Sequence, residues 1–249
     1  MNRIRQERIK KYVESRSVAT IKELRELFPE VSLMTIHRDL DVLERQGVIA
    51  KYRGGVKSVH YPEDVDVDVR LKENNEGKLS MVKKAMTLIQ PHSSVFLDAG
   101  TSNLFLARNL PDISLNIITT GLGIALELSR LHNPAVTVCG GTMNRKNLAI
   151  SGQNTIEMLE KINIDTALIG VSGCSAETGF TCGTEADMII KRTVIKKARV
   201  RIMMCGAEKF KRLMPYTFAT MQDADFIVAD GPLPEDFVES AKKSGVVIL

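Results

Sequence analysis

The sequence has no tryptophan and only four cysteines, and aromatic residues make up 5% of it. Cys139, Cys174, Cys182 and Cys205 form no C-x-x-C pair, which argues against a zinc site and against a disulfide framework. No metal is therefore expected. We interpret the four thiols as small, buried hydrophobic side chains in a reducing compartment.

Two further absences exclude whole classes of protein. No apolar run approaches the roughly 18 residues that a membrane span needs. The first residues are charged and lack the apolar core of a signal peptide, so we expect a cytoplasmic protein with no membrane partner. Neither a G-x-G-x-x-G motif nor a P-loop is present, and no nucleotide cofactor is expected.

Positive charge is concentrated in the first quarter of the chain. Residues 1–57 contain 13 Lys and Arg against 8 Asp and Glu, a net charge of +5. The remainder contains 21 basic and 22 acidic residues. A basic head on a near-neutral body is what attraction to nucleic-acid phosphates requires, although a solvated charged face would explain the same excess.

Two amphipathic patterns at helical spacing begin the chain. Residues 3–15 have an apolar stripe made of Ile4, Ile9, Tyr12 and Val13. A second helix follows, and its start carries the capping-box pattern of Thr20 and Glu23. The stretch from residue 20 to residue 39 then has the length of a helix-turn-helix unit.

The third helix has the features of a recognition helix. Ile36, Leu40 and Leu43 share one face, and Ser32 is placed to cap the first turn. The opposite face has a basic tip that would suit a major groove. An ordinary surface helix is the alternative for this stretch alone, and the neighbouring elements favour the DNA-reading interpretation.

Residues 48–56 predict a short hairpin with its turn at Gly54–Gly55, which would be the wing of a winged helix. For His37 a packing role and a base or phosphate contact stay open, whereas Arg38 is the stronger candidate for a base contact. The candidate DNA-binding residues are Thr20, Ser32, Met34, Thr35, His37, Arg38, Lys51 and Arg53.

At 249 residues the chain has room for a small and a medium domain. We predict a winged helix-turn-helix domain at 1–57, an acidic linker at 58–77 and a larger domain at 78–249. In the last, short apolar runs alternate with helical patterns, which predicts an α/β domain with a mostly parallel sheet covered on both faces. The predicted strands are 94–98, 115–119, 135–139, 166–170, 200–205, 226–230 and 246–249, and the helices 78–89, 101–110, 122–132, 153–161, 185–198 and 234–244.

Small and polar residues follow five of these strands. Open parallel sheets bind ligands at the carboxyl ends of their strands, and the sequence places glycines, hydroxyls, one Asp and one Lys there. Each stretch alone is equally well explained as a turn. Together they predict a pocket for a phosphorylated sugar, with the candidate effector-binding residues Asp98, Gly100, Thr101, Ser102, Thr119, Thr120, Gly140, Gly141, Gly170 and Lys209.

Motifs in both halves resemble those of one family. Residues 35–40 (TIHRDL), 43–47 (LERQG) and 53–55 (RGG) resemble the signature of DeoR-type bacterial transcriptional regulators. Residues 96–102 (FLDAGTS), Gly140-Gly141, 179–181 (GFT), Glu185 and Lys209 resemble the body of the same family. The resemblance covers essentially the whole chain. It implies a winged-helix reader, a sugar-phosphate sensor similar in fold to ribose-5-phosphate isomerase, and a homodimer or homotetramer.

The chain departs from the family pattern at four positions. The family usually has His where Arg53 stands, and Asn where Thr120 stands. It usually has Asp three residues before the pocket lysine and Ser one residue before it, where this chain has Gly206 and Glu208. The reader half therefore resembles the family closely, whereas the sensor pocket is altered.

The combined pattern predicts a repressor of carbohydrate-use genes that binds double-stranded operator DNA and is modulated by a phosphorylated sugar, without catalysis. A sugar-phosphate isomerase with an appended DNA-binding domain is the alternative, with Asp98 or Glu185 as candidate base. A DNA-binding scaffold with an empty pocket is the third hypothesis.

Overall fold

The computed structural model describes residues 2–59, 71, 74–210 and 212–249. They belong to two units, residues 1–63 with 211–214 and residues 64–210 with 215–249. The predicted linker, 58–77, falls largely outside the described residues, so the domain limits at 57 and 78 stay predictions. No helix among the described residues is long and apolar enough to cross a membrane.

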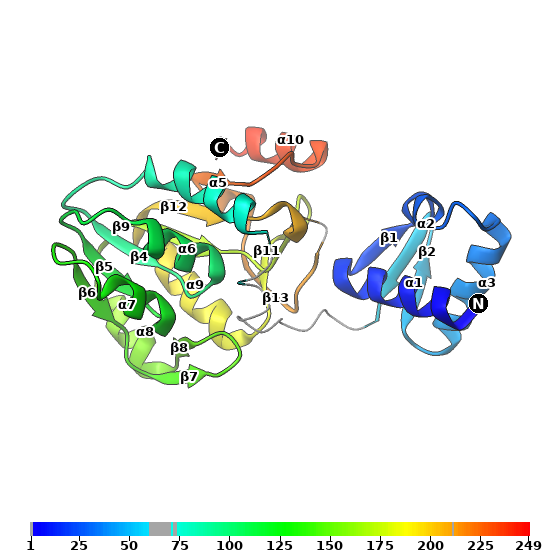
Figure 1. The fold of residues 1–249 in the computed structure, drawn as a ribbon, viewed down its shortest axis with the longest axis horizontal. Helices are drawn as coiled ribbons and strands as arrows, with labels where there is room; N and C mark the ends of the chain where they lie inside the picture. The colour runs from blue at the N-terminus through cyan, green and yellow to red at the C-terminus, as the bar shows by residue number, and fades with distance from the viewer. Residues whose placement is uncertain (1, 60–70, 72–73, 211) are drawn as a thin grey trace. The chain divides into compact units, whose positions relative to one another are not determined.

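Three helices and a small antiparallel sheet form the first unit (Figure 1). The helices are α1 (Asn2–Arg16), α2 (Ile21–Leu27) and α3 (Leu33–Arg45). The strands are β1 (Val18–Thr20), β2 (Ile49–Tyr52) and β3 (Gly55–Ser58), in the order β1-β3-β2. All of these elements except the turns contribute to one core, which contains Ile9, Val13, Ala19, Leu24, Phe28, Ile36, Leu40, Leu43, Ile49 and Val56.

Two details of the first unit differ from the sequence prediction. Ile4, expected in the apolar stripe of α1, is 71% exposed. The hairpin turn lies at Arg53–Gly54, because Tyr52 pairs with Gly55. Gly55 belongs to β3, where an added Cβ would lie 2.5 Å from the carbonyl oxygen of Ala19, so its lack of a side chain permits the close approach of β1.

The second unit is built on a seven-stranded sheet in which every neighbouring pair is parallel. All seven strands were predicted from the sequence. Their order is β15-β14-β12-β9-β4-β5-β6. They are β4 (Ser94–Leu97), β5 (Asn116–Thr119), β6 (Ala135–Val138), β9 (Ile164–Gly170), β12 (Ala198–Met204), β14 (Phe226–Val228) and β15 (Val247–Ile248).

Helices cover both faces of this sheet (Figure 1). One face packs against α5 (Asn75–Met86), α6 (Thr101–Asn109) and α7 (Leu122–Leu128). The other packs against α8 (Gln153–Glu160), α9 (Glu185–Lys197) and α10 (Glu235–Lys243). Burial on both faces explains why the strands read as near-continuous apolar runs.

The strand order changes direction between β4 and β9. The chain passes from β4 outward to β5 and β6, then returns to the other side of β4 and continues through β9, β12, β14 and β15. Such a switch point leaves a crevice at the carboxyl ends of the two central strands, because their connections leave in opposite directions. The crevice is where a ligand site is expected.

Short antiparallel strands complete the second unit, and the sequence did not predict them. A hairpin joins β7 (Thr142–Asn144) to β8 (Ala149–Ser151). A separate sheet in the order β10-β11-β13 contains β10 (Gly173–Ser175), β11 (Gly179–Cys182) and β13 (Tyr216–Ala219). With three or four residues each, these strands are too short for a clear alternation of apolar and polar side chains.

Replacing Asp225 by asparagine tests a cross-strand ion pair. Both Asp225 oxygens accept hydrogen bonds from the Arg201 guanidinium at 2.8 Å, and this bonding lowers the pKa of Asp225 below its ordinary value of 3.8. The stabilisation is therefore complete above pH 3.8 and lost as pH falls through the lower folded-state pKa. We expect the variant to be about 1 kcal/mol less stable at pH 7.

Urea unfolding at pH 7 and near pH 3 measures this difference, which should shrink at the lower pH. Glu239→Gln on the exposed surface of α10 is the matched control, and it should show no such change. An Asp225→Asn deficit that is equal at both pH values would contradict the ion-pair explanation.

Candidate functional site

The exposed side of α3 forms the first candidate site. Ser32 caps the helix as predicted, since its hydroxyl oxygen accepts a hydrogen bond from the Thr35 N–H at 3.2 Å. Met34 is 64% exposed and Arg38 is exposed, whereas His37 is half-buried. The basic tip of α3 is therefore open to solvent, with Arg38 better placed to reach a base edge than His37.

Buried polar contacts fix α3 against α1. Asp39 is buried on the apolar face of α3 and accepts hydrogen bonds from Arg5 Nε at 2.5 Å and from Gln6 Nε2 at 2.8 Å. Arg5 and Gln6 occupy the inward side of the first turns of α1, which leaves Ile4 outward. In the sequence, Asp39 lies on the helix face that carries the apolar residues Ile36 and Leu40. An acidic residue on that face was the available indication of a buried polar contact.

The two candidate DNA-binding residues of the wing, Lys51 and Arg53, differ in their contacts. The Lys51 ammonium pairs with Asp41 and with Glu44, the latter at 3.3 Å, and the Lys51 N–H donates to Glu44 Oε1 at 2.9 Å. These carboxylates raise the pKa of Lys51, with the Asp41 hydrogen bond as the largest cause. Arg53 is exposed at the turn. Lys51 thus holds the wing to α3, and Arg53 and Lys57 are exposed cations of the wing.

Thr20 has a local role at the start of α2. Its hydroxyl oxygen accepts a hydrogen bond from the Glu23 N–H at 3.1 Å, and Glu23 Oε2 accepts one from the Thr20 N–H at 2.7 Å. The predicted capping box is confirmed. This capping orients the helix that precedes the turn before α3.

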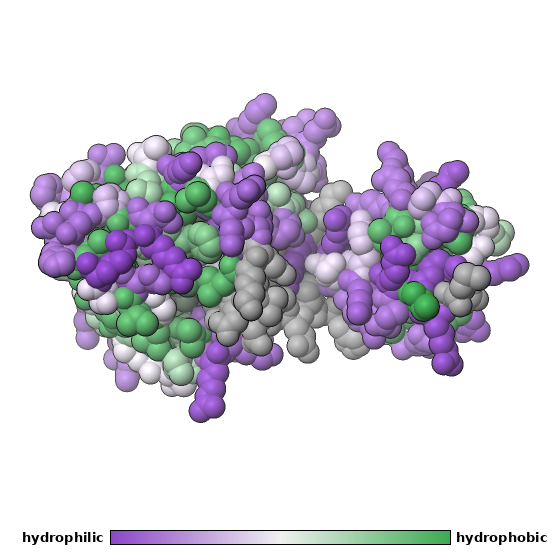
Figure 2. All heavy atoms as spheres, in the orientation of Figure 1, coloured by the Kyte–Doolittle hydropathy of each residue, from purple (hydrophilic) through white to green (hydrophobic). Residues whose placement is uncertain are grey.

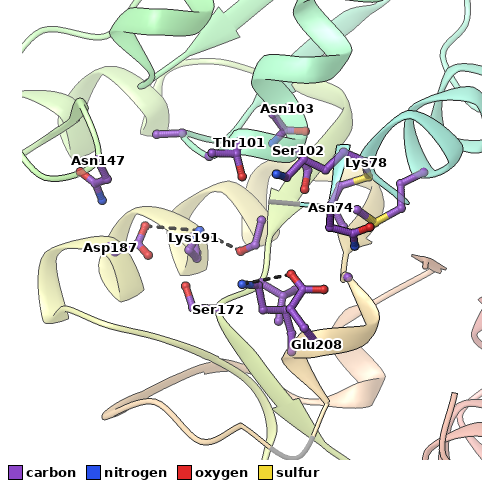
Figure 3. Close-up of a pocket in the computed structure, with 18 residues that line it drawn as sticks. Asn74, Lys78, Thr101, Ser102, Asn103, Asn147, Ser172, Asp187, Lys191 and Glu208 are labelled. Atoms are coloured by element: carbon purple, nitrogen blue, oxygen red, sulfur yellow. Dashed lines mark hydrogen bonds and ion pairs between the residues drawn. The ribbon is translucent and has the colours of Figure 1, made fainter. Parts of the chain in front are cut away.

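The second candidate site is a polar pocket at the switch point of the parallel sheet (Figure 3). It encloses about 740 Å³ including its open mouth. The segments that follow β4, β9 and β12 form most of its wall, joined by α5 and α9. Its polar lining residues include Asn74, Lys78, Thr101, Ser102, Asn103, Asn147, Ser172, Asp187, Lys191, Glu208 and Lys209.

The start of α6 faces this pocket. Gly100 precedes the helix, and no side chain caps the first turn. The first backbone N–H groups of a helix have no partner within it, and together with the helix dipole they attract anions. Thr101 and Ser102 add hydroxyl groups beside them (Figure 3). This wall of the pocket is suited to a phosphate.

A buried lysine crosses the floor of the pocket. Lys191 on α9 pairs with Asp98 and, at 3.3 Å, with Asp187, and it donates to the Gly170 carbonyl oxygen at 3.0 Å. Burial alone would lower the pKa of Lys191, but the carboxylates of Asp187 and Asp98 raise it above its ordinary value. Asp98 also accepts a hydrogen bond from the Gly170 N–H at 2.9 Å. It therefore lies beneath the pocket and joins β4 to β9.

Glu208 occupies the space above Gly206 at the end of β12. A Cβ on Gly206 would lie 2.5 Å from Glu208 Oε2. The Glu208 carboxylate also pairs with Lys209, with 3.2 Å between Oε1 and Nζ. The Glu208 carboxylate thus occupies the space that a side chain at position 206 would need.

Two of the predicted threonines lie outside this pocket. Thr119 is buried, donates to the Leu97 carbonyl oxygen at 2.6 Å and accepts from the Gly121 N–H at 3.0 Å. Thr120 lines a smaller neighbouring cavity that shares Asn147 with the main pocket. The structure therefore gives Thr119 a role in joining strands and leaves Thr120 beside the pocket.

The predicted glycine pair is also away from the pocket lining. The Gly140 carbonyl oxygen accepts a hydrogen bond from the Thr155 hydroxyl at 2.7 Å. Gly141 has a φ of +154°, and an added Cβ would lie 2.4 Å from both the Ser151 carbonyl oxygen and the Thr155 hydroxyl oxygen. Close packing of the β7–β8 hairpin against α8 explains these glycines.

The structure brings Gly100, Thr101, Ser102, Gly170 and Lys209 together at the pocket. All five lie at or after the carboxyl ends of strands, where ligand-binding residues are expected from the sequence. Sequence reasoning missed the contributions of α5, the β7–β8 loop and α9, namely Asn74, Lys78, Asn147, Asp187 and Lys191. A lysine beside Ile190 and Val194 on the apolar face of α9 was the one available signal. Glu185, the other candidate base, is exposed in the first turn of α9.

No group of His, Cys, Asp and Glu suited to a metal ion occurs among the residues that the structure describes. The four cysteines are all buried. Burial raises the pKa of Cys139 to about 11 and, as the largest cause, that of Cys182 to about 12. Both thiols are therefore protonated at neutral pH, which suits the packing role expected of them.

Sequence comparison assigns the two candidate sites to two domains of one protein family. The DeoR-like helix-turn-helix domain matches residues 5–61, and the DeoR C-terminal sensor domain matches residues 73–231. The chain belongs to the DeoR family of transcriptional regulators. The α3 surface is thus part of the family's DNA-binding domain, and the pocket lies in its sensor domain.

Relatives of this DeoR-family chain match it along most of its length. An uncharacterized HTH-type transcriptional regulator of Escherichia coli, YgbI, is 31% identical over 98% of this chain and 96% of its own. The HTH-type transcriptional repressor GlcR of Bacillus subtilis is 31% identical over 88% of this chain and 85% of its own. A putative aga operon transcriptional repressor of Escherichia coli O157:H7 is 26% identical over 98% and 92%.

Solved structures resemble the DeoR-family chain over about half to two thirds of its length. Ribose 5-phosphate isomerase A from Methanocaldococcus jannaschii is 14% identical and covers 55% of each chain, with a TM-score of 0.42. A probable sor operon regulator from Shigella flexneri is also 14% identical, covers 67% of this chain and 88% of its own, and has a TM-score of 0.40.

Proposed function

We propose that this DeoR-family regulator represses genes of carbohydrate metabolism and that a phosphorylated sugar, bound in the sensor pocket, releases it from operator DNA. Repression is supported by relatives such as the transcriptional repressor GlcR and the putative aga operon transcriptional repressor. Binding of the sugar and binding of the DNA are then coupled, so that each weakens the other. The active form is a homodimer or homotetramer that acts without turnover.

The observation that carries the sensor proposal is the pairing of an uncapped helix start with lysines in one pocket. The phosphate of the effector binds the N–H groups and hydroxyls at Thr101 and Ser102. Lys209 supplies positive charge when its contact with Glu208 opens. Asp187 and Glu208 then accept hydrogen bonds from sugar hydroxyls, with Glu208 in the place of the aspartate that the family usually carries at 206.

Sensing without catalysis is supported by the state of the carboxylates. A general base for isomerisation must reach the substrate carbon within about 3 Å or through one water. Asp98 is only 1% exposed and is held by Lys191. Asp187 and Glu208 each pair with a lysine. Glu185 is exposed but does not line the pocket. The isomerase alternative therefore lacks an unpaired carboxylate in the pocket among these four residues.

The exposure of residues on α3 and on the wing supports the following DNA contacts. Arg38 reads a base in the major groove beside Met34, and Arg53 contacts phosphate from the wing. Ser32 and Thr35 hold the first turn of α3 against the sugar-phosphate backbone of the DNA. Lys51 contributes by orienting the wing.

A thermal-shift screen of the whole chain against pentose and hexose phosphates tests the proposal. A bound effector at one hundred times its Kd should stabilise the protein by about 2.7 kcal/mol through mass action. Lys209→Met should remove most of the shift. Lys243→Met, which changes a lysine that is 80% exposed on α10, should leave it unchanged.

The unphosphorylated sugars and inorganic phosphate are the ligand controls. A shift that is equal for a sugar and its phosphate would contradict phosphate recognition. Sustained turnover of a sugar phosphate in a coupled assay would favour the isomerase. A chain that binds promoter DNA but responds to no sugar phosphate would be a scaffold without a functioning sensor.

A further inference from the structure

One edge of the parallel sheet is open. β6 is the last strand in the order and pairs with β5 alone. The N–H groups of Ala135 and Cys139 donate to β5 and its flanks, to Leu115 and Thr119, both at 2.9 Å. Because residues alternate in direction along a parallel strand, Val136 and Val138 direct their N–H and C=O groups toward the open side.

This edge lacks the features that usually prevent pairing. Native edge strands carry charged side chains, internal prolines or bulges, or are very short. β6 has the uncharged sequence Ala-Val-Thr-Val, with Pro134 only before it. The opposite edge strand, β15, has two residues. Among the strands that the structure describes in this sheet, β6 is therefore the edge that is suited to pair further.

Apolar side chains lie beside the open backbone groups. Val136 packs against the core cluster that includes Ile124 and Leu128 of α7, and Val138, two residues on, faces the same side of the sheet. Val138 is 39% exposed, and Leu126 on α7 is 77% exposed. Figure 2 shows hydrophobic surface over the part of the unit that carries α7. Val138 thus adds an exposed apolar side chain to the open edge.

We propose that β6 pairs antiparallel with β6 of a second copy of this chain, about a twofold axis that passes through Thr137. Val136 then exchanges hydrogen bonds with Val138 of the second copy, and Val138 with its Val136. The two Thr137 residues face each other as the pair without hydrogen bonds. Val138 of each copy is covered by Val136 of the other.

A second copy is favoured over any other occupant for two reasons. An identical edge supplies donors and acceptors in matching positions, and a twofold axis places no like charges together because β6 has none. In addition, a helix-turn-helix unit reads one half-site, and dimers read two. The proposal gives the homo-oligomer a specific surface and does not depend on which ligand the pocket binds.

A single cysteine tests the register. Opposed residues without mutual hydrogen bonds have Cα atoms about 4.5 Å apart, a separation that a disulfide spans. Thr137→Cys in the full chain should therefore form a reducible dimer under mild oxidation. Val247→Cys, at a residue 47% exposed on the opposite edge strand β15, is the matched control, and it should stay monomeric on non-reducing gels. Absence of the Thr137→Cys cross-link, or equal cross-linking of Val247→Cys, would overturn the proposal.

The native mass in solution gives the second measurement. The unmodified chain should have an even multiple of 27.6 kDa by light scattering. Val138→Lys should halve that mass at the same concentration, because each ammonium group would be placed against Val136 of the second copy and would lose its hydration. Val247→Lys, at a residue 47% exposed on β15, should leave it unchanged. A monomeric wild type, or a folded Val138→Lys variant of unchanged mass, would show that β6 is not the interface.

Discussion

Replacing Lys191 by methionine is expected to lower the free energy of unfolding of the α/β unit by about 3–5 kcal/mol, the usual cost of breaking a buried ion pair. Methionine fills similar volume but leaves the carboxylate of Asp98 buried without its cation. Asp98 Oδ1 already has no hydrogen-bond partner, so the Gly170 N–H would remain its main support. For a domain of this size the loss corresponds to a fall in Tm of roughly 6–20 °C.

The double variant Asp98→Asn with Lys191→Met is the matched control. It removes both charges, so it should recover part of the stability that Lys191→Met loses. Calorimetry of the four proteins in this cycle measures the coupling. If the double variant is as unstable as the sum of the two single variants, the pair is not energetically coupled and the explanation fails.

Replacing Arg38 by alanine is expected to weaken binding to operator DNA by about 1–3 kcal/mol, a loss of roughly 5- to 150-fold. The physical reason is the loss of a bidentate contact to a base from the exposed tip of α3. Binding to random DNA should change much less, since it depends on phosphates. Fluorescence anisotropy on a sequence selected from a random library, and on scrambled DNA, measures both.

Arg45→Ala provides the comparison on the same helix. Arg45 lies in the last turn of α3, away from the basic tip, and its removal should affect the two DNAs alike. Equal losses on selected and scrambled DNA for Arg38→Ala would assign Arg38 to phosphate. The slope of log K against log salt would then fall by about one.

Most of the fold could be predicted because its signals are local. The capping box at Thr20 and the cap at Ser32 fixed two helix starts within three residues of sequence. Each of the seven parallel strands was a short apolar run between helical patterns. The short strands β7, β8, β10, β11 and β13 lacked such patterns, because they are held by neighbours far along the chain rather than by a period of their own.

The candidate pocket was predicted in part for the same reason. The turn at Gly100–Ser102 follows a strand directly, so its place at the sheet edge is determined by the strand rule. Lys191 could not be assigned this way, since its partner Asp98 lies 93 positions earlier. Thr119 and Gly141 carried the same small-residue signal as the pocket turns, but their side-chain space is filled by neighbouring strands.

The sequence by itself determined that a basic winged-helix head precedes a parallel α/β body, that α3 presents its basic tip outward, and that small and polar residues follow the strands of the sheet. These properties follow from periodicity, caps and charge within a few residues. Only the tertiary structure decided that Asp39 is anchored by α1, that Lys51 is held by α3, and that β6 is an open edge. Contacts between residues distant in sequence depend on how elements pack, and local patterns do not encode that packing.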